Sequence, residues 1–348
     1  MITNAHIAIL GATGAVGQEF IRLIEERHVP YSQLTLLASA RSSGKKLTVK
    51  DKEYVVQEAR PEAFKGVDIA LFAGGSISQT LAPKAAAEGA VVIDNSSAFR
   101  MDSKVPLVIP EINPEDIATH KGIIANPNCS TIIMLMALKP IHDLSPIQRI
   151  IVSTYQAVSG AGKEGMTELE TQLRAFSEGK SSQAHVLPVS SLDIHYPIAN
   201  NLIPQIDVFL DNGYSKEEMK MVNETHKVFH DDSIAVTATT VRVPVMRSHA
   251  MSVYIETADP LPIDRVRAAI ESANGVRVVD DLTHMKYPMP LYTSEKDDVE
   301  VGRIRADLSV PSGINMWIVG DQIRKGAALN TLQIAEYMLA HNLVQGRN

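Results

Sequence analysis

The segment HIAILGATGAVGQEFIRLIEER, residues 6–27, decides the fold of the first part of the chain. It opens with a short apolar run rich in isoleucine, which is typical of a buried strand. Gly11, Gly14 and Gly17 follow, and apolar residues then recur with helical spacing through residues 18–27. The segment therefore predicts a strand, a tight glycine turn and an amphipathic helix.

Working outward, similar apolar runs recur at intervals long enough to contain crossover connections. A helix is expected over residues 82–88, closed by Gly89 in the left-handed conformation that glycine often adopts after a helix. This alternation predicts a Rossmann-type α/β domain, residues 1–127, with a doubly wound parallel sheet. Further strands are expected at residues 34–38, 67–73, 91–94 and 107–109.

The character of the sequence changes after Pro127, where a continuous apolar helix is expected from Cys129 onward. The following strand candidates are joined by longer segments, which predicts an α+β domain with a mostly antiparallel sheet over residues 128–326. Residues 327–343 have helical periodicity, and we expect residues 327–348 to pack back onto the first domain. The strand candidates of the second domain are residues 150–156, 235–243, 252–256 and 276–279.

Composition excludes several classes of function. The chain has 348 residues, a net charge of −7 and 45% hydrophobic residues, so it lacks the basic face that sequence-independent nucleic-acid binding requires. No segment reaches the roughly 20 apolar residues of a membrane helix, and no secretory signal is evident, so a cytoplasmic protein is expected. One cysteine and eleven histidines show no ligand spacing, so no metal site is expected, and His226 and His230 are interpreted as surface residues.

The glycine turn stands where a dinucleotide fold brings backbone amides to a pyrophosphate. A glycine-rich turn without a ligand is the alternative, but the position between a strand and a helix favours a cofactor. After the second strand, Arg41 and Ser42 occupy the place where an NAD site usually has an acidic residue. An arginine there can bind a 2′-phosphate, which favours NADP over NAD, although a solvated surface arginine is also possible.

Cys129 is the only cysteine and directly precedes the apolar helix. Unpaired amides and the helix dipole at such a position favour the thiolate, so Cys129 is a candidate nucleophile. A cysteine beside an apolar run is otherwise a buried small hydrophobe. A thiolate beside a nicotinamide would attack an acyl group or aldehyde, with hydride transfer at the resulting thioester or thiohemiacetal carbon.

Seven motifs together resemble aspartate-semialdehyde dehydrogenase, in the order and spacing of that family and over nearly the whole chain. They are GATGAVG at 11–17, FAGGS at 72–76, DNSSAFR at 94–100, NPNCST at 126–131, YQAVSGAG at 155–162, EEMKMVNET at 217–225 and RVPVMRSH at 242–249.

The resemblance implies a role for each matching residue. Cys129 would be the nucleophile, Gln156 would orient the acyl-enzyme, and His249, with its near-neutral intrinsic pKa, would be the general acid and base. The resemblance assigns the substrate α-carboxylate to Arg242, the amino group to Glu217, and the phosphate to Lys220 and Arg100. A one-residue shift in alignment would exchange Glu217 and Glu218. Cofactor contacts are implied for Gly11, Thr13, Gly14, Ala15, Val16, Gly17, Arg41, Ser42, Ser159, Gly160 and Gln322.

The implied reaction is the NADP-dependent, reversible reductive dephosphorylation of 4-phospho-L-aspartate to L-aspartate 4-semialdehyde. It would serve the biosynthesis of diaminopimelate, lysine, threonine and methionine. A homodimer or larger homo-oligomer is implied as well. Two alternatives stay open: a related reductase of N-acetylglutamyl phosphate, and a catalytically silent dinucleotide-binding scaffold.

Overall fold

The computed structural model describes residues 4–344, which form two compact units. The first unit comprises the chain up to Asn128, Lys227–Phe229 and the chain from Ala327 onward. The second unit comprises Cys129–His226 and His230–Gly326.

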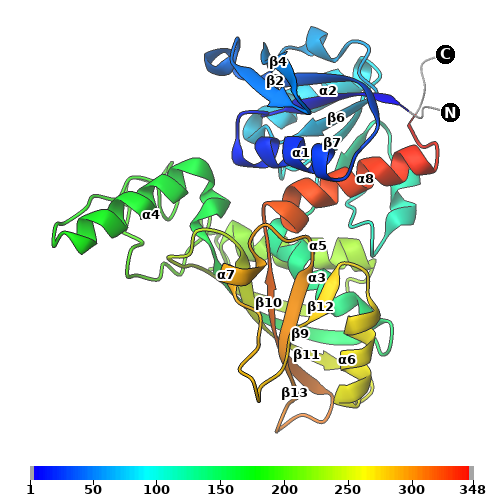
Figure 1. Ribbon diagram of the computed structural model, residues 1–348. Coiled ribbons are helices and arrows are strands. Elements are labelled where there is room, and N and C mark those ends of the chain that lie inside the picture. Colours follow the sequence, from blue (N-terminus) through cyan, green and yellow to red (C-terminus); the bar gives the residue numbers. More distant parts are fainter. Residues whose placement is uncertain (1–3, 345–348) are drawn as a thin grey trace. The chain divides into compact units, whose positions relative to one another are not determined.

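The first unit is built on a six-stranded sheet in the order β5-β2-β1-β6-β7-β8 (Figure 1). Every neighbouring pair in it is parallel, and the strand order reverses direction from β1, as in a doubly wound fold. The predicted Rossmann-type sheet is confirmed. Its strands are β1 (Ala5–Leu10), β2 (Tyr31–Ala38), β5 (Gln57–Glu58), β6 (Ile69–Phe72), β7 (Val91–Asp94) and β8 (Ile123–Ala125).

Alternate side chains of β1 enter two separate cores, because successive residues of a strand point to opposite faces. Ile7 and Ile9 lie in the core that contains α1 (Ala15–Glu26) and α8 (Leu329–Ala340). Ala8 and Leu10 lie in the core on the other face, with α2 (Ser78–Ala87). Helices thus cover both faces of this sheet, and α8 joins the first unit beside α1.

The strand predicted at residues 107–109 does not form, and this prediction was wrong. Leu107 makes only an isolated bridge to Ala125, and β8 takes the place at the sheet edge. The Asn113 side chain instead accepts from the Ile109 N–H and donates to the Leu107 carbonyl, both at 2.9 Å. Asn113 therefore satisfies two backbone groups of the segment. Backbone hydrogen bonds to β8 are limited to the Val108 N–H with the Ala125 carbonyl and the Ala125 N–H with the Pro106 carbonyl, which make the isolated bridge.

A small hairpin in the first unit was also not predicted. Its strands are β3 (Lys46–Val49) and β4 (Lys52–Val55). Lys50 and Asp51 between them both have positive φ, the backbone of a two-residue hairpin turn. Lysine is an unusual choice there, so the sequence carried no turn signal.

The short 3₁₀ segments are η1 (Ala40–Ser42), η2 (Pro61–Phe64), η3 (Gly75–Ile77) and η4 (Pro114–Thr119) in the first unit and η5 (Val158–Ala161) in the second.

The second unit contains a six-stranded sheet in the order β10-β9-β11-β14-β13-β12. Its three central pairings are antiparallel and its two outer pairings are parallel, so the sheet is mixed, with antiparallel pairs in the majority. The strands are β9 (Ile147–Gln156), β10 (Ala235–Arg242), β11 (His249–Thr257), β12 (Val276–Val278), β13 (Val299–Ala306) and β14 (Gly313–Gly320). The last two were not among the predicted strands.

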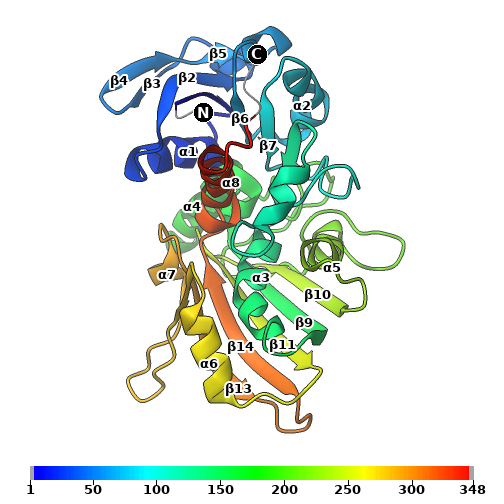
Figure 2. The same cartoon turned by 90° about the vertical axis from the view of Figure 1, so that its right-hand side faces the viewer.

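One face of this sheet is covered by α3 (Cys129–His142) together with α6 (Ile263–Ser272) (Figure 2). The residues from Ser130 to Leu138 are all buried, as expected for a helix that is apolar all round. The first residue of α3 is thereby held on a rigid element. The other helices of the unit are α4 (Gly162–Ser177), α5 (Lys216–Phe229, whose last three residues group with the first unit) and α7 (Pro290–Thr293), and the π-helical turn η6 (Arg324–Ala328) precedes α8.

Candidate active site

Chemically reactive side chains gather at one end of the sheet in the second unit. Gln156 ends β9 and pairs in register with Arg242, which ends the parallel strand β10. His249 begins the antiparallel strand β11, opposite Gly320 at the end of β14. These strand directions bring four chain segments, which are far apart in sequence, to the same end of the sheet.

Gln156 lies at the centre of this group. Its Nε2 donates to Glu217 Oε1 at 3.2 Å, and its Oε1 accepts from the Thr154 hydroxyl at 3.1 Å. The same Nε2 lies 3.3 Å from Nε2 of His249. All four side chains are buried, so these contacts fix the direction of the amide.

His249 has no exposed surface, and Nδ1 accepts the Ala157 backbone N–H at 3.1 Å. Burial, followed by the nearby Arg242 charge, lowers the pKa of His249 to about 3, and the Glu217 charge opposes this only in part. The folded protein thus shifts this ring away from the near-neutral intrinsic pKa of histidine. The ring is uncharged at neutral pH because the fold removes water from it and places a cation beside it.

Arg242 is 4% exposed. Its Nη1 donates to the Ala157 carbonyl at 2.7 Å, whereas Nε finds no acceptor among the described residues. Burial lowers the pKa of Arg242, and the charges of Glu217 and Cys129 oppose that effect. A guanidinium stays protonated in proteins, so the fold holds a buried cation with a donor directed to no protein group. Such a group suits a planar anion as ligand.

Glu217 and Glu218 are adjacent but make different contacts. Glu217 Oε2 pairs with Lys220 Nζ at 3.0 Å, the ion pair expected for residues three apart on a helix. Glu218 instead closes a capping box with Ser215 and accepts the Thr240 N–H at 2.9 Å. Of the two, Glu217 contacts Gln156, whereas Glu218 stabilises the start of α5 and its contact with β10.

Lys220 also pairs with Asp207, at 3.0 Å. Burial lowers the pKa of Lys220, but the charges of Glu217 and Asp207 outweigh it and leave the pKa raised. The ammonium is therefore charged and held at the edge of the group. Asp207 was not predicted as part of the site, because its loop carries no periodic pattern that would place it opposite α5.

Cys129 is the first residue of α3, where helix amides and the dipole favour the thiolate. Its charge reaches Arg242, as the electrostatic interaction between the two groups shows. Gly326 packs on its other side: a Cβ at residue 326 would lie 2.8 Å from Cβ of Cys129. The sulfur is thus placed in the same group, and Gly326 leaves room for it.

Ser159, Gly160 and Gln322 lie beside this group. Gln322 accepts the Ser248 N–H at 2.8 Å and donates to the Ser159 hydroxyl. A Cβ at residue 160 would lie 2.7 Å from Nη1 of Arg242 and 3.4 Å from Nε2 of His249. The glycine at 160 therefore keeps open the space in front of both groups.

Arg100 belongs to the first unit, apart from the residues above. Its Nε donates to the Asn126 carbonyl at 2.9 Å, and one Nη donates to the Asn95 carbonyl at 2.8 Å. The guanidinium therefore supports the backbone that leads into Cys129.

The glycine turn of the first unit is compact because only glycine fits two of its positions. Gly11 has φ +82°, and a Cβ at Gly17 would lie 2.1 Å from the Gly11 carbonyl oxygen. Gly14 is the N-cap of α1 and has no side chain to cap it. The first amides of α1, from Ala15, Val16 and Gly17, have no helical carbonyl to bond and are suited to an anion.

The loop after β2 meets this turn. The Thr13 hydroxyl lies 3.5 Å from the Ser42 hydroxyl, which joins the glycine turn to η1. Ser42 is buried and Arg41 is exposed. A phosphate at this loop would meet the hydroxyl groups of Thr13 and Ser42 and the exposed Arg41 side chain.

Two family models match this chain. Residues 6–120 match the model described as semialdehyde dehydrogenase, NAD binding domain, and residues 138–325 match the one described as semialdehyde dehydrogenase, dimerisation domain. Aspartate-semialdehyde dehydrogenase of Bacillus subtilis is 51% identical over 341 residues, covering 97% of this chain and 99% of its own. The enzyme of that name from Aquifex aeolicus is also 51% identical, over 344 residues, with the same coverage. This chain belongs to the aspartate-semialdehyde dehydrogenase family.

Solved members of the family agree, and the resemblance found from the motifs is confirmed. Aspartate semialdehyde dehydrogenase II of Vibrio cholerae, solved in complex with ASA, has a TM-score of 0.92 and 47% identity, covering 97% of this chain and 98% of its own. The Candida albicans aspartate semialdehyde dehydrogenase, solved with NADP, has a TM-score of 0.74 and 25% identity, covering 98% of this chain and all of its own.

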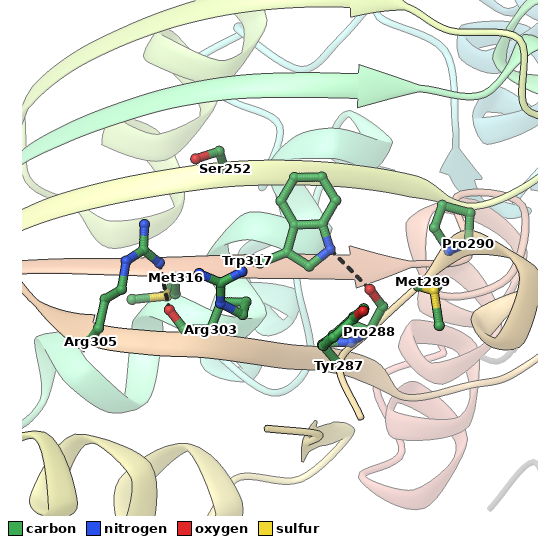
Figure 3. A pocket seen from close by; sticks show the side chains of 9 residues that line it. All are labelled: Ser252, Tyr287, Pro288, Met289, Pro290, Arg303, Arg305, Met316 and Trp317. Carbon is green, nitrogen blue, oxygen red and sulfur yellow. Dashed lines mark hydrogen bonds between the residues drawn. The ribbon is translucent and has the colours of Figure 1, made fainter. Parts of the chain in front are cut away.

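A separate hollow lies on the sheet of the second unit, away from the reactive group (Figure 3). Its volume is about 300 Å³, and Trp317, Pro288 and Arg305 are among its lining residues. The Trp317 indole N–H donates to the Pro288 carbonyl at 3.0 Å. The hollow brings no nucleophile or acid–base pair together, so we assign it no part in the chemistry.

The histidines outside the group have structural positions. His226 is half-buried and bonds the Ile234 carbonyl at 2.8 Å, so its interpretation as a surface residue was wrong. His230 is exposed, as predicted, and lies in the left-handed conformation just after α5. In residues 4–344, no three His, Cys, Asp or Glu side chains are grouped as metal ligands, and no helix is long and apolar enough to cross a membrane.

Proposed function

We propose that this protein catalyses the reversible reduction of 4-phospho-L-aspartate to L-aspartate 4-semialdehyde, using NADPH and a Cys129 acyl thioester. The observation that carries the proposal is the buried Arg242 with an unpartnered Nε, grouped with a thiol, an amide and a carboxylate. A cation held this way needs an anionic ligand, because an unpaired buried donor costs free energy. The substrate α-carboxylate is such a ligand.

Glu217 and Lys220 extend this recognition. Glu217 already accepts hydrogen bonds from Gln156 and Lys220, so a substrate ammonium would meet a carboxylate held in place on both sides. Lys220 keeps a raised pKa and can donate to the substrate phosphate, since an ammonium has three donors. We assign a second phosphate contact to Arg100.

Acyl transfer begins at Cys129. The thiolate attacks the acyl carbon of the acyl phosphate, and the carbon–oxygen bond to phosphate breaks, which leaves the thioester. Gln156 orients that intermediate, and His249 serves as the proton-carrying group beside it. NADPH, when bound, supplies the hydride that reduces the thioester to the aldehyde.

The first unit fits that cofactor. The positive φ of Gly11 and the close approach at Gly17 form a turn that exposes amides to a pyrophosphate. We assign Gly11, Thr13, Gly14, Ala15, Val16 and Gly17 to the diphosphate and Arg41 and Ser42 to the 2′-phosphate, and from the second unit we assign Ser159, Gly160 and Gln322 to the nicotinamide side.

Substitution of the thiol tests the mechanism. Cys129→Ala and Cys129→Ser remove the nucleophile, so NADPH oxidation with 4-phospho-L-aspartate should fall at least about 1,000-fold. NADPH binding, followed by its fluorescence, should be unchanged. Full activity in either variant would contradict the mechanism, and a wild-type protein without thiol-dependent turnover would be the silent scaffold.

The reductase of N-acetylglutamyl phosphate is the nearest rival activity. Its substrate carries an uncharged, acylated nitrogen, which gives the Glu217 carboxylate no cation to bind. Rates of NADPH oxidation with the two acyl phosphates separate the activities. A preference for the N-acetylated substrate would overturn the assignment.

The choice of NADP over NAD rests on Arg41 and the hydroxyls of Thr13 and Ser42. Arg41→Ala should weaken NADPH binding by about tenfold, since one charge-assisted contact is lost, and should leave NADH binding unchanged. An equal loss for both cofactors would show that Arg41 does not read the 2′-phosphate.

The remaining assignments follow from the family. We propose a cytoplasmic homodimer or larger homo-oligomer that supplies the aldehyde for diaminopimelate, lysine, threonine and methionine biosynthesis. Residues 1–127 with 327–348 would form the dinucleotide-binding domain, and residues 128–326 the catalytic and dimerisation domain. Sedimentation velocity measures the oligomeric state, and a monomer at micromolar concentration would contradict it.

A further inference from the structure

The ammonium of Lys220 lies between two carboxylates. Its Nζ is 3.0 Å from Glu217 Oε2 and 3.0 Å from Asp207 Oδ2. The exposed fraction of the side chain rises from 7% for Glu217 to 24% for Lys220 and 32% for Asp207, so the three charges lead from the interior toward solvent. We call these three side chains the three-charge cluster. Two carboxylates and one ammonium give it a formal charge of −1.

Asp207 is held in place by its own loop. Its φ is +67°, a backbone conformation that aspartate adopts more readily than most residues. Oδ1 accepts the Val208 N–H at 2.8 Å, while Oδ2 faces Lys220. The Val208 carbonyl in turn accepts the N–H of Lys216, the first residue of α5, at 2.9 Å. Backbone hydrogen bonds therefore hold this carboxylate beside α5 in addition to the ion pair.

Glu217 without Asp207 would attract a further cation only weakly. Lys220 already pairs with Glu217, and the charge of Arg242 on β10 also interacts with it. A substrate α-carboxylate would offset the charge of Arg242, but Lys220 would still cancel the charge of Glu217. A second negative charge is therefore needed if this part of the site is to bind an ammonium.

The phosphate assigned to Lys220 cannot supply that charge throughout the proposed reaction. Phosphate leaves when the thioester forms, whereas the substrate ammonium stays until the aldehyde is released. Asp207 is present at every stage and lies 3.0 Å from Lys220. Its carboxylate can therefore balance the lysine whenever phosphate is absent.

We propose that Asp207 determines specificity for the substrate amino group, because its carboxylate balances Lys220 and leaves the charge of Glu217 to bind an ammonium. This inference rests on the proposed function and deepens it. It adds a residue that selects an α-amino aldehyde over the same aldehyde without the amino group. Asp207 acts through the net charge of the three-charge cluster and not through contact with the substrate.

The test compares two aldehydes that differ only in the amino group, L-aspartate 4-semialdehyde and succinate semialdehyde. Enzyme and NADP are mixed with each aldehyde without phosphate, and the NADPH formed in the first turnover is followed by its absorbance. Lys220 then has no phosphate to balance it. The wild type should react at least about tenfold faster with the aminated aldehyde at low concentration, since a charge-assisted contact is gained.

Asp207→Asn removes the charge, keeps the shape and suits the same φ, so the preference for the aminated aldehyde should fall about three- to tenfold. The rate with succinate semialdehyde should not fall. Asp207→Glu keeps the charge and should retain most of the preference. Asp211→Asn, at an exposed position in the same loop, is the matched control and should keep the wild-type preference. If Asp207→Asn fails to fold, Asp207→Gly replaces it, because glycine accepts a positive φ.

A defect in folding or packing would slow the reaction of both aldehydes alike, so an equal fall in the two rates overturns the proposal. Equal loss of the preference in Asp207→Glu and Asp207→Asn also overturns it, since shape and not charge would then matter. If the wild type prefers the aminated aldehyde and Asp207→Asn keeps that preference, only the role of Asp207 is refuted. A wild type with no preference refutes the substrate assignment of Glu217 as well.

Discussion

The glycine turn of the first unit and the reactive group of the second are built in opposite ways. The turn is one continuous segment, and its ligand-binding groups are backbone amides exposed by glycines. The reactive group consists of side chains from the last residues of β9 and β10 and from the starts of β11, α3 and α5. A backbone site therefore depends on the absence of side chains, and a side-chain site depends on register and burial.

Among the changes that compare these two kinds of site, the largest effect is expected at Arg242, whose side chain is part of the reactive group. Arg242→Lys keeps a cation but loses the planar fork, so kcat/KM should fall about 100- to 1,000-fold, equivalent to roughly 3–4 kcal/mol. NADPH binding should be unchanged. Arg277→Lys, at an exposed position on β12, is the matched control. Similar activity in both lysine variants would mean that the fork binds no substrate.

The opposite kind of site is tested at Gly17, where an added methyl meets backbone. Gly17→Ala places a Cβ 2.1 Å from the Gly11 carbonyl, so we expect about 3 kcal/mol of destabilisation and loss of dinucleotide binding. Gly14→Ala is the control, because its nearest contact is 3.3 Å and its φ is −85°. Melting temperature and cofactor titration measure both, and equal behaviour of the two variants would refute the steric account.

Glu217 and Glu218 are neighbours in the first turn of α5, but we expect one substitution to reduce activity and the other to reduce stability. Glu217→Ala should lower kcat/KM, with a rise of about 2 kcal/mol in the activation free energy, because a charged hydrogen-bonding group is lost. Glu218→Ala should instead lower stability by about 1 kcal/mol through loss of the capping box, with turnover nearly unchanged. Assays and thermal melts on both variants decide this, and exchanged phenotypes would place Glu218 at the substrate.

The last prediction concerns acid stability. The folded pKa of His249 is about 3 and its ordinary value is 6.5, so between these values the unfolded chain binds a proton that the folded chain does not. Wild-type stability should therefore fall as the pH drops from 6.5 toward 3, by at most about 1.4 kcal/mol per pH unit from this residue. His249→Gln should lack this contribution. Parallel curves of melting temperature against pH for the two proteins would contradict it.

Much of the first unit could be predicted because its signals are local. The run of residues 6–10, the glycines after it and the helical spacing of residues 18–27 lie together in the sequence. The exception is residues 107–109, where the Asn113 side chain binds the Ile109 N–H and the Leu107 carbonyl, and only an isolated bridge to β8 forms. No pattern within residues 107–109 indicates this contact.

The reactive group was harder to predict, because its members become neighbours only through strand order. Asp207 and Gly326 were missed for this reason, because their contacts are with Lys220 and Cys129, and Thr154 was missed although its partner is nearby. Alternation along β9 could have placed Thr154 on the same face as Gln156, two residues away. Nothing local connects Gly326 with Cys129.

The sequence by itself determined the glycine turn, the two-part chain, the candidate thiol and the family, since each is recorded in consecutive residues or in ordered motifs. Only the tertiary structure decided that Glu217 rather than Glu218 faces Gln156 and that burial beside Arg242 keeps His249 uncharged at neutral pH. The physical reason is that charge and hydrogen bonding depend on burial and on the partners packed nearby. Those partners come from strands and helices that meet only when the chain has folded.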